Sequence, residues 1–114
     1  MRLTDIIQLT HAKLVSGIDP GSHELQKAFS SDLMSDVLTL EEEHMLLITG
    51  LANPQLIRTA EMADIEVVLL ARNKKATPEM IELAEEVGLV LIESPFSIFK
   101  VSGILYANGL QPVY

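Results

Sequence analysis

The residues that could do chemistry concentrate in one polar stretch, residues 30–36, which reads SSDLMSD. It holds two Ser-Asp pairs, Ser31-Asp32 and Ser35-Asp36, four positions apart. Hydroxyls and free amides at a strand-to-helix junction can hold the phosphate or the ribose of a ligand. The two carboxylates would oppose a phosphate unless they faced sugar hydroxyls or a cation. The stretch therefore predicts a polar ligand site at the end of a strand.

A structural role is the alternative for the same stretch, and we favour it. Ser31 or Asp32 can cap a short helix, because either side chain can accept a hydrogen bond from the free backbone amides at a helix start. The apolar residues that we expect this helix to pack inward are Leu33, Met34, Val37 and Leu38. Both interpretations remain open at this point.

The chain is acidic, with one basic exception. Sixteen Asp and Glu residues against eight Lys and Arg residues give a formal net charge of −8, which disfavours nonspecific binding to nucleic acids and to anionic membranes. The exception is residues 72–75, Arg-Asn-Lys-Lys. We interpret this segment first as a solvated loop, and second as a place where Arg72 and Lys74 would face the phosphate of a ligand.

The motifs that announce an enzyme are absent from the sequence. It has no phosphate-binding loop, glycine-rich dinucleotide turn, HExxH zinc helix or GxSxG nucleophile motif. His11, His23 and His44 stand in unrelated contexts, without a partner three or four positions away. We interpret the acidic run 41–43, which precedes His44, as a solvated edge. We therefore predict a binding protein with no catalytic residue, no metal and no cofactor, not an enzyme.

Three apolar runs alternate with three helical patterns in the second half of the chain. The expected strands are residues 44–50, 65–71 and 89–92. The expected helices are residues 53–63, residues 77–88 and a last segment that opens at Ser94-Pro95 and ends at Asn108-Gly109. Thr77 followed by Pro78 is typical of a helix start. The stripe that we expect helix 77–88 to bury consists of Met80, Leu83, Ala84 and Val87.

The first part of the chain has a less regular pattern. Residues 4–9 predict a short helix capped by Thr4, and residues 12–16 predict a short strand. Residues 17–22 predict a turn by their Gly and Pro content. Residues 26–30 then predict a strand that leads directly into the Ser-Asp pairs.

Strands that are apolar on both faces and separated by helices imply right-handed βαβ crossovers. The fold class is therefore α/β, with a mainly parallel sheet of four to five strands flanked by helices on both faces, in a single domain over residues 1–114. Open α/β sheets bind ligands beyond the carboxyl ends of their strands. The residues that we expect there are Ser30, Ser31, Asp32, Thr49, Gly50, Asn53, Arg72 and Lys74.

The sequence resembles the DRTGG domain family at residues 29–37, FSSDLMSDV, where that family typically has an aromatic residue followed by a Ser-Asp-Leu-Leu-Ser-Asp-Val-like stretch. The strand end Ile48-Thr49-Gly50, the helix start Asn53-Pro54 and residues 94–99 are also similar to the family. One tract departs from it. Residues 23–28 read HELQKA and lack the Gly pair that precedes the aromatic residue in the family.

Several expectations follow from the resemblance alone. It implies a compact α/β unit related to the N-terminal domain of HPr kinase/phosphorylase. Such units occur alone, beside nucleotide-sensing CBS domains in regulatory pyrophosphatases, and in the N-terminal region of some phosphotransacetylases. They look like regulatory or assembly modules that often pair as dimers. The kinase activity of the HPr enzyme lies in another domain, so the resemblance does not imply that activity.

Two classes of function follow. The first is a stand-alone, non-catalytic regulatory module, a homodimer that acts on a partner enzyme; Phe96, Phe99 and Tyr106 are candidates for its self-complementary surface. The second is a sensor of a small ligand, a nucleotide or a phosphorylated metabolite, at the carboxyl ends of the strands. The chain has no cysteine and no apolar run long enough to span a bilayer, so we expect a cytoplasmic protein in either case.

Overall fold

The computed structural model describes residues 1–17 and 23–114. Apart from Gly17, the turn expected at residues 17–22 lies outside the described residues. In chain order the elements are α1 (Leu3–Thr10), β1 (Lys13–Ser16), β2 (Lys27–Ser30), α2 (Met34–Val37), β3 (Met45–Thr49), α3 (Pro54–Met62), β4 (Val67–Leu70), α4 (Pro78–Val87), β5 (Val90–Glu93), α5 (Ile98–Ala107) and β6 (Gln111–Pro112).

The strands form one sheet in the order β1-β5-β4-β3-β2-β6. Every neighbouring pair is parallel except β1 and β5, which are antiparallel. The prediction of a mainly parallel α/β sheet is confirmed, but the expected number of four to five strands is too low. The missed strand is β6, because two residues that include a proline give no recognisable strand pattern.

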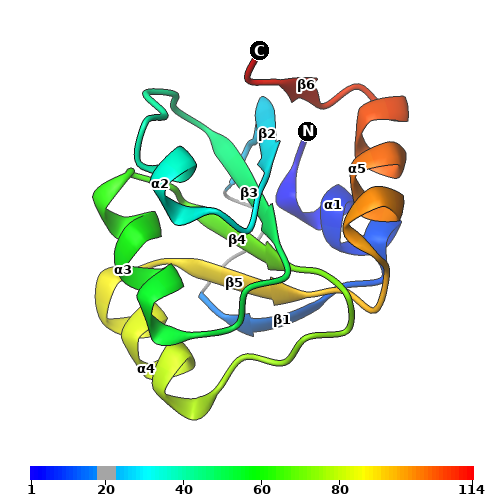
Figure 1. Ribbon diagram of the computed structural model, residues 1–114. Coiled ribbons are helices and arrows are strands. Elements are labelled where there is room, and N and C mark those ends of the chain that lie inside the picture. The colour runs from blue at the N-terminus through cyan, green and yellow to red at the C-terminus, as the bar shows by residue number, and fades with distance from the viewer. Residues whose placement is uncertain (18–22) are drawn as a thin grey trace.

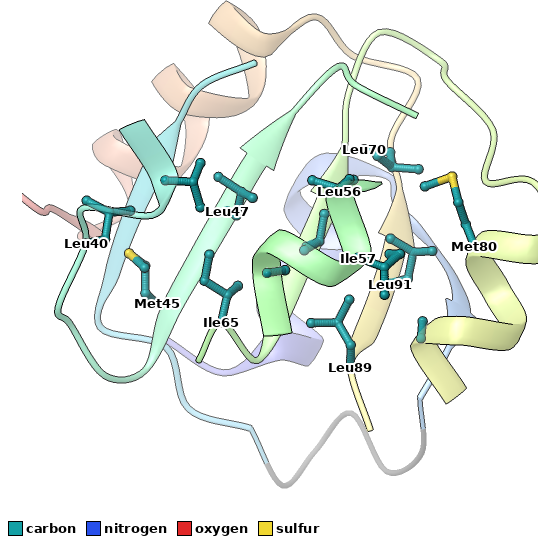
Figure 2. Packing of buried hydrophobic residues seen from close by; sticks show 14 residues of the cluster. Leu40, Met45, Leu47, Leu56, Ile57, Ile65, Leu70, Met80, Leu89 and Leu91 are labelled. Carbon is teal, nitrogen blue, oxygen red and sulfur yellow. The ribbon is translucent and has the colours of Figure 1, made fainter. Parts of the chain in front are cut away.

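Helices cover both faces of the sheet, as the two-sided apolar strands predicted. On one face α2, α3 and α4 pack over side chains such as Leu47, Val68 and Leu91 (Figures 1 and 2). On the other face α1 and α5 pack over Leu46 and Leu69, among others (Figure 1). Successive strand residues therefore enter two separate cores, which fixes the register of each central strand.

Side-chain caps define where three of the helices begin. Asn53 Oδ1 accepts a hydrogen bond from Leu56 N at 3.1 Å, and Thr77 Oγ1 accepts one from Met80 N at 3.1 Å. In both helices a proline follows the cap, where its missing N–H costs nothing. The last helix begins later than expected, because Ser97 and not Ser94 is its cap.

Several local expectations are wrong. α1 begins at Leu3 after Arg2, with no side-chain cap, so Thr4 does not cap it. Leu33 and Leu38 are exposed, because α2 has a single turn and only Val37 is fully buried from it. Val87 is exposed at the last position of α4, where the chain turns back toward β5. No helix among residues 1–17 and 23–114 has the length and apolar character needed to cross a bilayer.

Candidate functional site

The carboxyl ends of β2 and β3 are tied together by the side chain of Asp32, which follows β2. Asp32 Oδ1 accepts a hydrogen bond from Thr49 Oγ1 at 2.8 Å and another from Gly50 N at 2.7 Å. Parallel pairing of Ser30 with Ile48 brings these groups to the same edge of the sheet. The carboxylate thus accepts two donors from the end of the neighbouring strand.

The Ser-Asp stretch does not cap α2. The residue before α2 is Leu33, which makes no side-chain cap hydrogen bond. Ser31 Oγ instead accepts from Leu33 N at 3.0 Å, two residues on, and forms a local turn. The predicted cap is therefore wrong, because Asp32 bonds to the end of β3 and not to the helix.

Arg72 joins this group from the end of β4. Its Nη1 lies 3.9 Å from Asp32 Oδ2, and the two side chains are 53% and 46% exposed, so water screens the ion pair. The stem of Arg72 covers Gly50, since a Cβ atom at Gly50 would lie 2.8 Å from Arg72 Cδ. The Arg72 backbone has a left-handed φ of 63° and its N–H donates to Phe96 O at 2.7 Å. Arg72 is therefore held in place by its backbone while its guanidinium stays half exposed.

Thr49, Gly50 and Asn53 are already engaged within the protein. Thr49 is buried, and its Oγ1 accepts from Leu51 N at 3.2 Å in addition to its bond with Asp32. The Gly50 N–H is donated to Asp32, and Asn53 caps α3. These three residues lie at the expected edge, but the hydrogen bonds that they make there are structural.

Ser30 and Lys74 lie apart from the Asp32 group. Ser30 Oγ is 2.8 Å from Ser102 Oγ of α5, a contact between residues far apart in the sequence. Lys74 is exposed and forms no ion pair with residues 1–17 or 23–114. The eight predicted site residues therefore divide into one compact cluster, Asp32, Thr49, Gly50 and Arg72, and four residues around it.

A buried carboxylate at the same edge was missed by the sequence analysis. Glu93 ends β5; its Oε2 accepts from Ala76 N at 2.7 Å, and its Oε1 lies 3.7 Å from Lys75 Nζ. A charged residue is rarely buried without partners. An acid at the end of an apolar strand, with a lysine pair upstream, was the signal that could have pointed to this contact.

Two histidines that stand in unrelated sequence contexts meet at one carboxylate. His23 Nδ1 lies 3.5 Å from Glu66 Oε2, and His44 Nδ1 lies 3.8 Å from Glu66 Oε1. Glu66 directly precedes β4 and Met45 begins β3, so this group lies at the amino ends of the strands. It is thus at the opposite edge of the sheet from Asp32 and Arg72.

An aromatic surface lies on α5. Phe99 is 89% exposed and Tyr106 is 67% exposed. They are seven positions apart, which places them on one side of the helix, two turns from each other. Phe96 does not share this surface: it is half buried, with His11 at 4.9 Å between ring centroids and Lys100 Nζ 3.8 Å from its ring centroid.

The cluster has a limited chemical range. It offers one carboxylate, one buried hydroxyl and one half-exposed guanidinium, and the guanidinium faces the carboxylate. Arg72 and Lys74 can attract an anion, whereas Asp32 weakens that attraction. Such a set suits recognition: its one hydroxyl, Thr49 Oγ1, donates to Asp32 at 2.8 Å but is buried.

No protein-family profile matches the chain, and no curated protein sequence matches it. Among solved structures, the fold is similar to a crystal structure of the CBS and DRTGG domains of the regulatory region of Clostridium perfringens pyrophosphatase, complexed with the activator diadenosine tetraphosphate. The TM-score is 0.75 at 17% sequence identity, over 97% of this chain and 47% of that chain. This chain therefore spans about half the length of that structure. At this identity the similarity concerns the fold alone, and it supports a fold related to that of the DRTGG domain.

Proposed function

We propose that this chain is a non-catalytic regulatory module of the DRTGG type, which pairs as a homodimer and acts on a partner enzyme. The observation that carries the pairing is the exposed aromatic surface of α5, formed by Phe99 and Tyr106. The similarity of the fold to the regulatory region of a pyrophosphatase supports a regulatory role. We include in the proposal one domain over residues 1–114, related to the N-terminal domain of HPr kinase/phosphorylase, in the cytoplasm.

The charge distribution supports α5 as the paired surface. The whole chain has a net charge of −8, so two copies repel each other unless their contact avoids the acidic residues. α5 contains no Asp or Glu, and Lys100 is its single charged residue. Aromatic residues on a surface poor in acids are typical of the core of a protein interface. A twofold axis across α5 would bring the same aromatic pair together from both copies.

The pairing is tested by light scattering of the full chain at sub-millimolar concentration. We expect twice the chain mass of 12.5 kDa, that is 2 × 12.5 = 25 kDa. In the double variant Phe99→Asp/Tyr106→Asp the dimer dissociation constant should rise by about 30-fold, because two interface anchors are lost and four like charges are introduced.

Met62→Asp is the matched control, because Met62 is an apolar residue of α3 with a similar exposure of 68%. This variant should remain dimeric. A strict monomer for the unaltered chain, or a double variant that pairs as tightly as the unaltered chain, contradicts the proposal.

A second candidate is a sensor of a nucleotide or a phosphorylated metabolite at the carboxyl ends of the strands. Its support is the half-exposed guanidinium of Arg72 beside the exposed Lys74. A ligand phosphate would exchange the screened contact with Asp32 for a charge-assisted hydrogen bond to Arg72. Ser31 lies next to Asp32 and would meet the same ligand.

Thermal unfolding with a panel of adenine nucleotides and sugar phosphates tests the sensor. We expect at least one compound to raise the midpoint, and Arg72→Ala to weaken its binding by about tenfold, the loss expected for a hydrogen bond to a charged group. Lys74→Ala should weaken binding less, and Arg58→Ala, an exposed arginine of α3, should leave it unchanged. If no compound shifts the midpoint, this candidate fails.

A further inference from the structure

A cavity of about 280 Å³ lies away from Arg72, between α5 and the edge of β2. β6 pairs with Lys27 and Ala28, and the chain leaves the sheet after Pro112 (Figure 1). The second half of β2 lines the cavity through Phe29 and Ser30. The cavity walls come from four segments of the chain. They include Ala28 and Ser30 of β2, Ile48 of β3, Ser102 and Tyr106 of α5, and Pro112 and Tyr114.

The lining of this cavity suits a neutral ring. None of the side chains among the described residues that line it is charged. A phosphate or carboxylate inside would lose hydration without gaining a counter-charge. Tyr106 and Tyr114 are among its lining residues, and the ring of Tyr114 lies 6.2 Å from the ring of Phe29 with an interplanar angle of 52°. A planar aromatic ligand can stack on, or meet edge-to-face, the exposed tyrosine rings.

The cavity also contains one pair of hydrogen-bonded serine hydroxyls. Ser30 Oγ and Ser102 Oγ both line it and are 2.8 Å from each other. Two hydroxyls carry two hydrogens, and the bond between them uses one. The second hydrogen is available for an acceptor on a ligand. This pair can therefore donate to a carbonyl oxygen or an unprotonated ring nitrogen, and its remaining lone pairs can accept from a ligand N–H.

The volume sets the size of the ligand. Cavities that hold drug-sized molecules start at about 300 Å³, so about 280 Å³ fits a single ring or two fused rings. We propose that this cavity is a binding site for a small, neutral, planar heteroaromatic ring with a hydrogen-bond acceptor. The walls of the site all belong to one chain, and Tyr106 is shared with the paired surface proposed above.

The site is tested by nuclear magnetic resonance titration of the isotope-labelled full chain. The ligands are adenine and nicotinamide, which are planar, neutral and rich in acceptors. Two comparison compounds lack defined properties: nicotinate is charged and not neutral, and cyclohexanecarboxamide keeps the amide on a ring that is not planar, not aromatic and without a nitrogen. We expect adenine or nicotinamide to shift the amide signals of Ser30 and Ser102 with a dissociation constant of about 0.1–1 mM. Both comparison compounds should bind at least about tenfold more weakly.

Two variants locate the binding within the cavity. Ser102→Leu fills it and should abolish the shifts, whereas Ala107→Leu adds the same bulk to an exposed position of α5 and should not. Ser30→Ala keeps the packing and removes one hydroxyl, so it should weaken binding by about three- to tenfold even if Ser102→Leu does not fold. The inference is overturned if neither ring shifts the two serine signals, if nicotinate or cyclohexanecarboxamide binds as tightly as nicotinamide, or if Ser30→Ala binds unchanged.

Discussion

Asp32→Ala is expected to lower the free energy of unfolding by about 2–3 kcal/mol. The substitution removes the acceptor of two hydrogen bonds, those donated by Thr49 Oγ1 and Gly50 N. Both donors belong to buried residues at the end of β3, so they lose a charged acceptor and regain water only in part. The half exposure of Asp32 keeps the expected cost below the sum for two fully buried bonds. Urea unfolding followed by circular dichroism measures the change, since the chain has no Trp for fluorescence.

Asp36→Ala supplies the matched control from the second Ser-Asp pair. Asp36 is exposed, and its carboxylate forms no hydrogen bond or ion pair within residues 1–17 and 23–114. Its loss should change the free energy of unfolding by less than about 0.5 kcal/mol. Asp32→Asn keeps a neutral acceptor and should fall between the two. Equal losses for Asp32→Ala and Asp36→Ala would mean that the bonds of Asp32 to β3 do not stabilise the sheet.

Much of the fold could be predicted because its information is local. Val67–Leu70 is apolar at every position, so it requires cover on both faces, and the helical patterns on either side of it supply that cover. β6 has no such local signal. Gln111 and Pro112 form a strand only because α5 returns the chain to the edge of β2, and this depends on packing far from either residue.

The position of the candidate site could be predicted from local sequence, but the contacts of its side chains could not. A common edge was predicted for four residues because each lies at or just after the end of a parallel strand: Asp32, Thr49, Gly50 and Arg72. They do lie together there. Their part in ligand binding stays a prediction. The direction of each side chain could not be predicted, because it depends on strand register and on partners distant in the sequence.

Ser30 illustrates that dependence. As the last residue of β2 it alternates to the face opposite Phe29, and its hydroxyl therefore meets Ser102 of α5 and not the Asp32 group. No residue near Ser30 in the sequence indicates a contact with α5. The cavity that these two serines line could not be predicted from the sequence for the same reason.

Gly17→Ala is expected to have the largest effect, lowering the free energy of unfolding by about 3–5 kcal/mol. Gly17 follows β1 with a φ of +107°, which an L-residue adopts only with strain. A Cβ atom there would lie 2.8 Å from Val90 Cγ2 and 3.1 Å from Val90 Cα. Val90 begins β5, the strand that pairs with β1, so its backbone cannot move aside without disturbing the edge of the sheet. The same urea titration measures the loss.

Gly109→Ala separates the two causes of that loss. Gly109 has nearly the same φ, +104°, but a Cβ atom there would meet nothing within 4 Å. Its substitution should cost only the backbone strain, about 1–3 kcal/mol. The difference between the two variants then measures the overlap with Val90, and we expect it to be about 2 kcal/mol. Equal losses of unfolding free energy in the two variants would mean that β1 moves away from Val90 at little cost. Close packing at Gly17 would then not hold the antiparallel edge strand against β5.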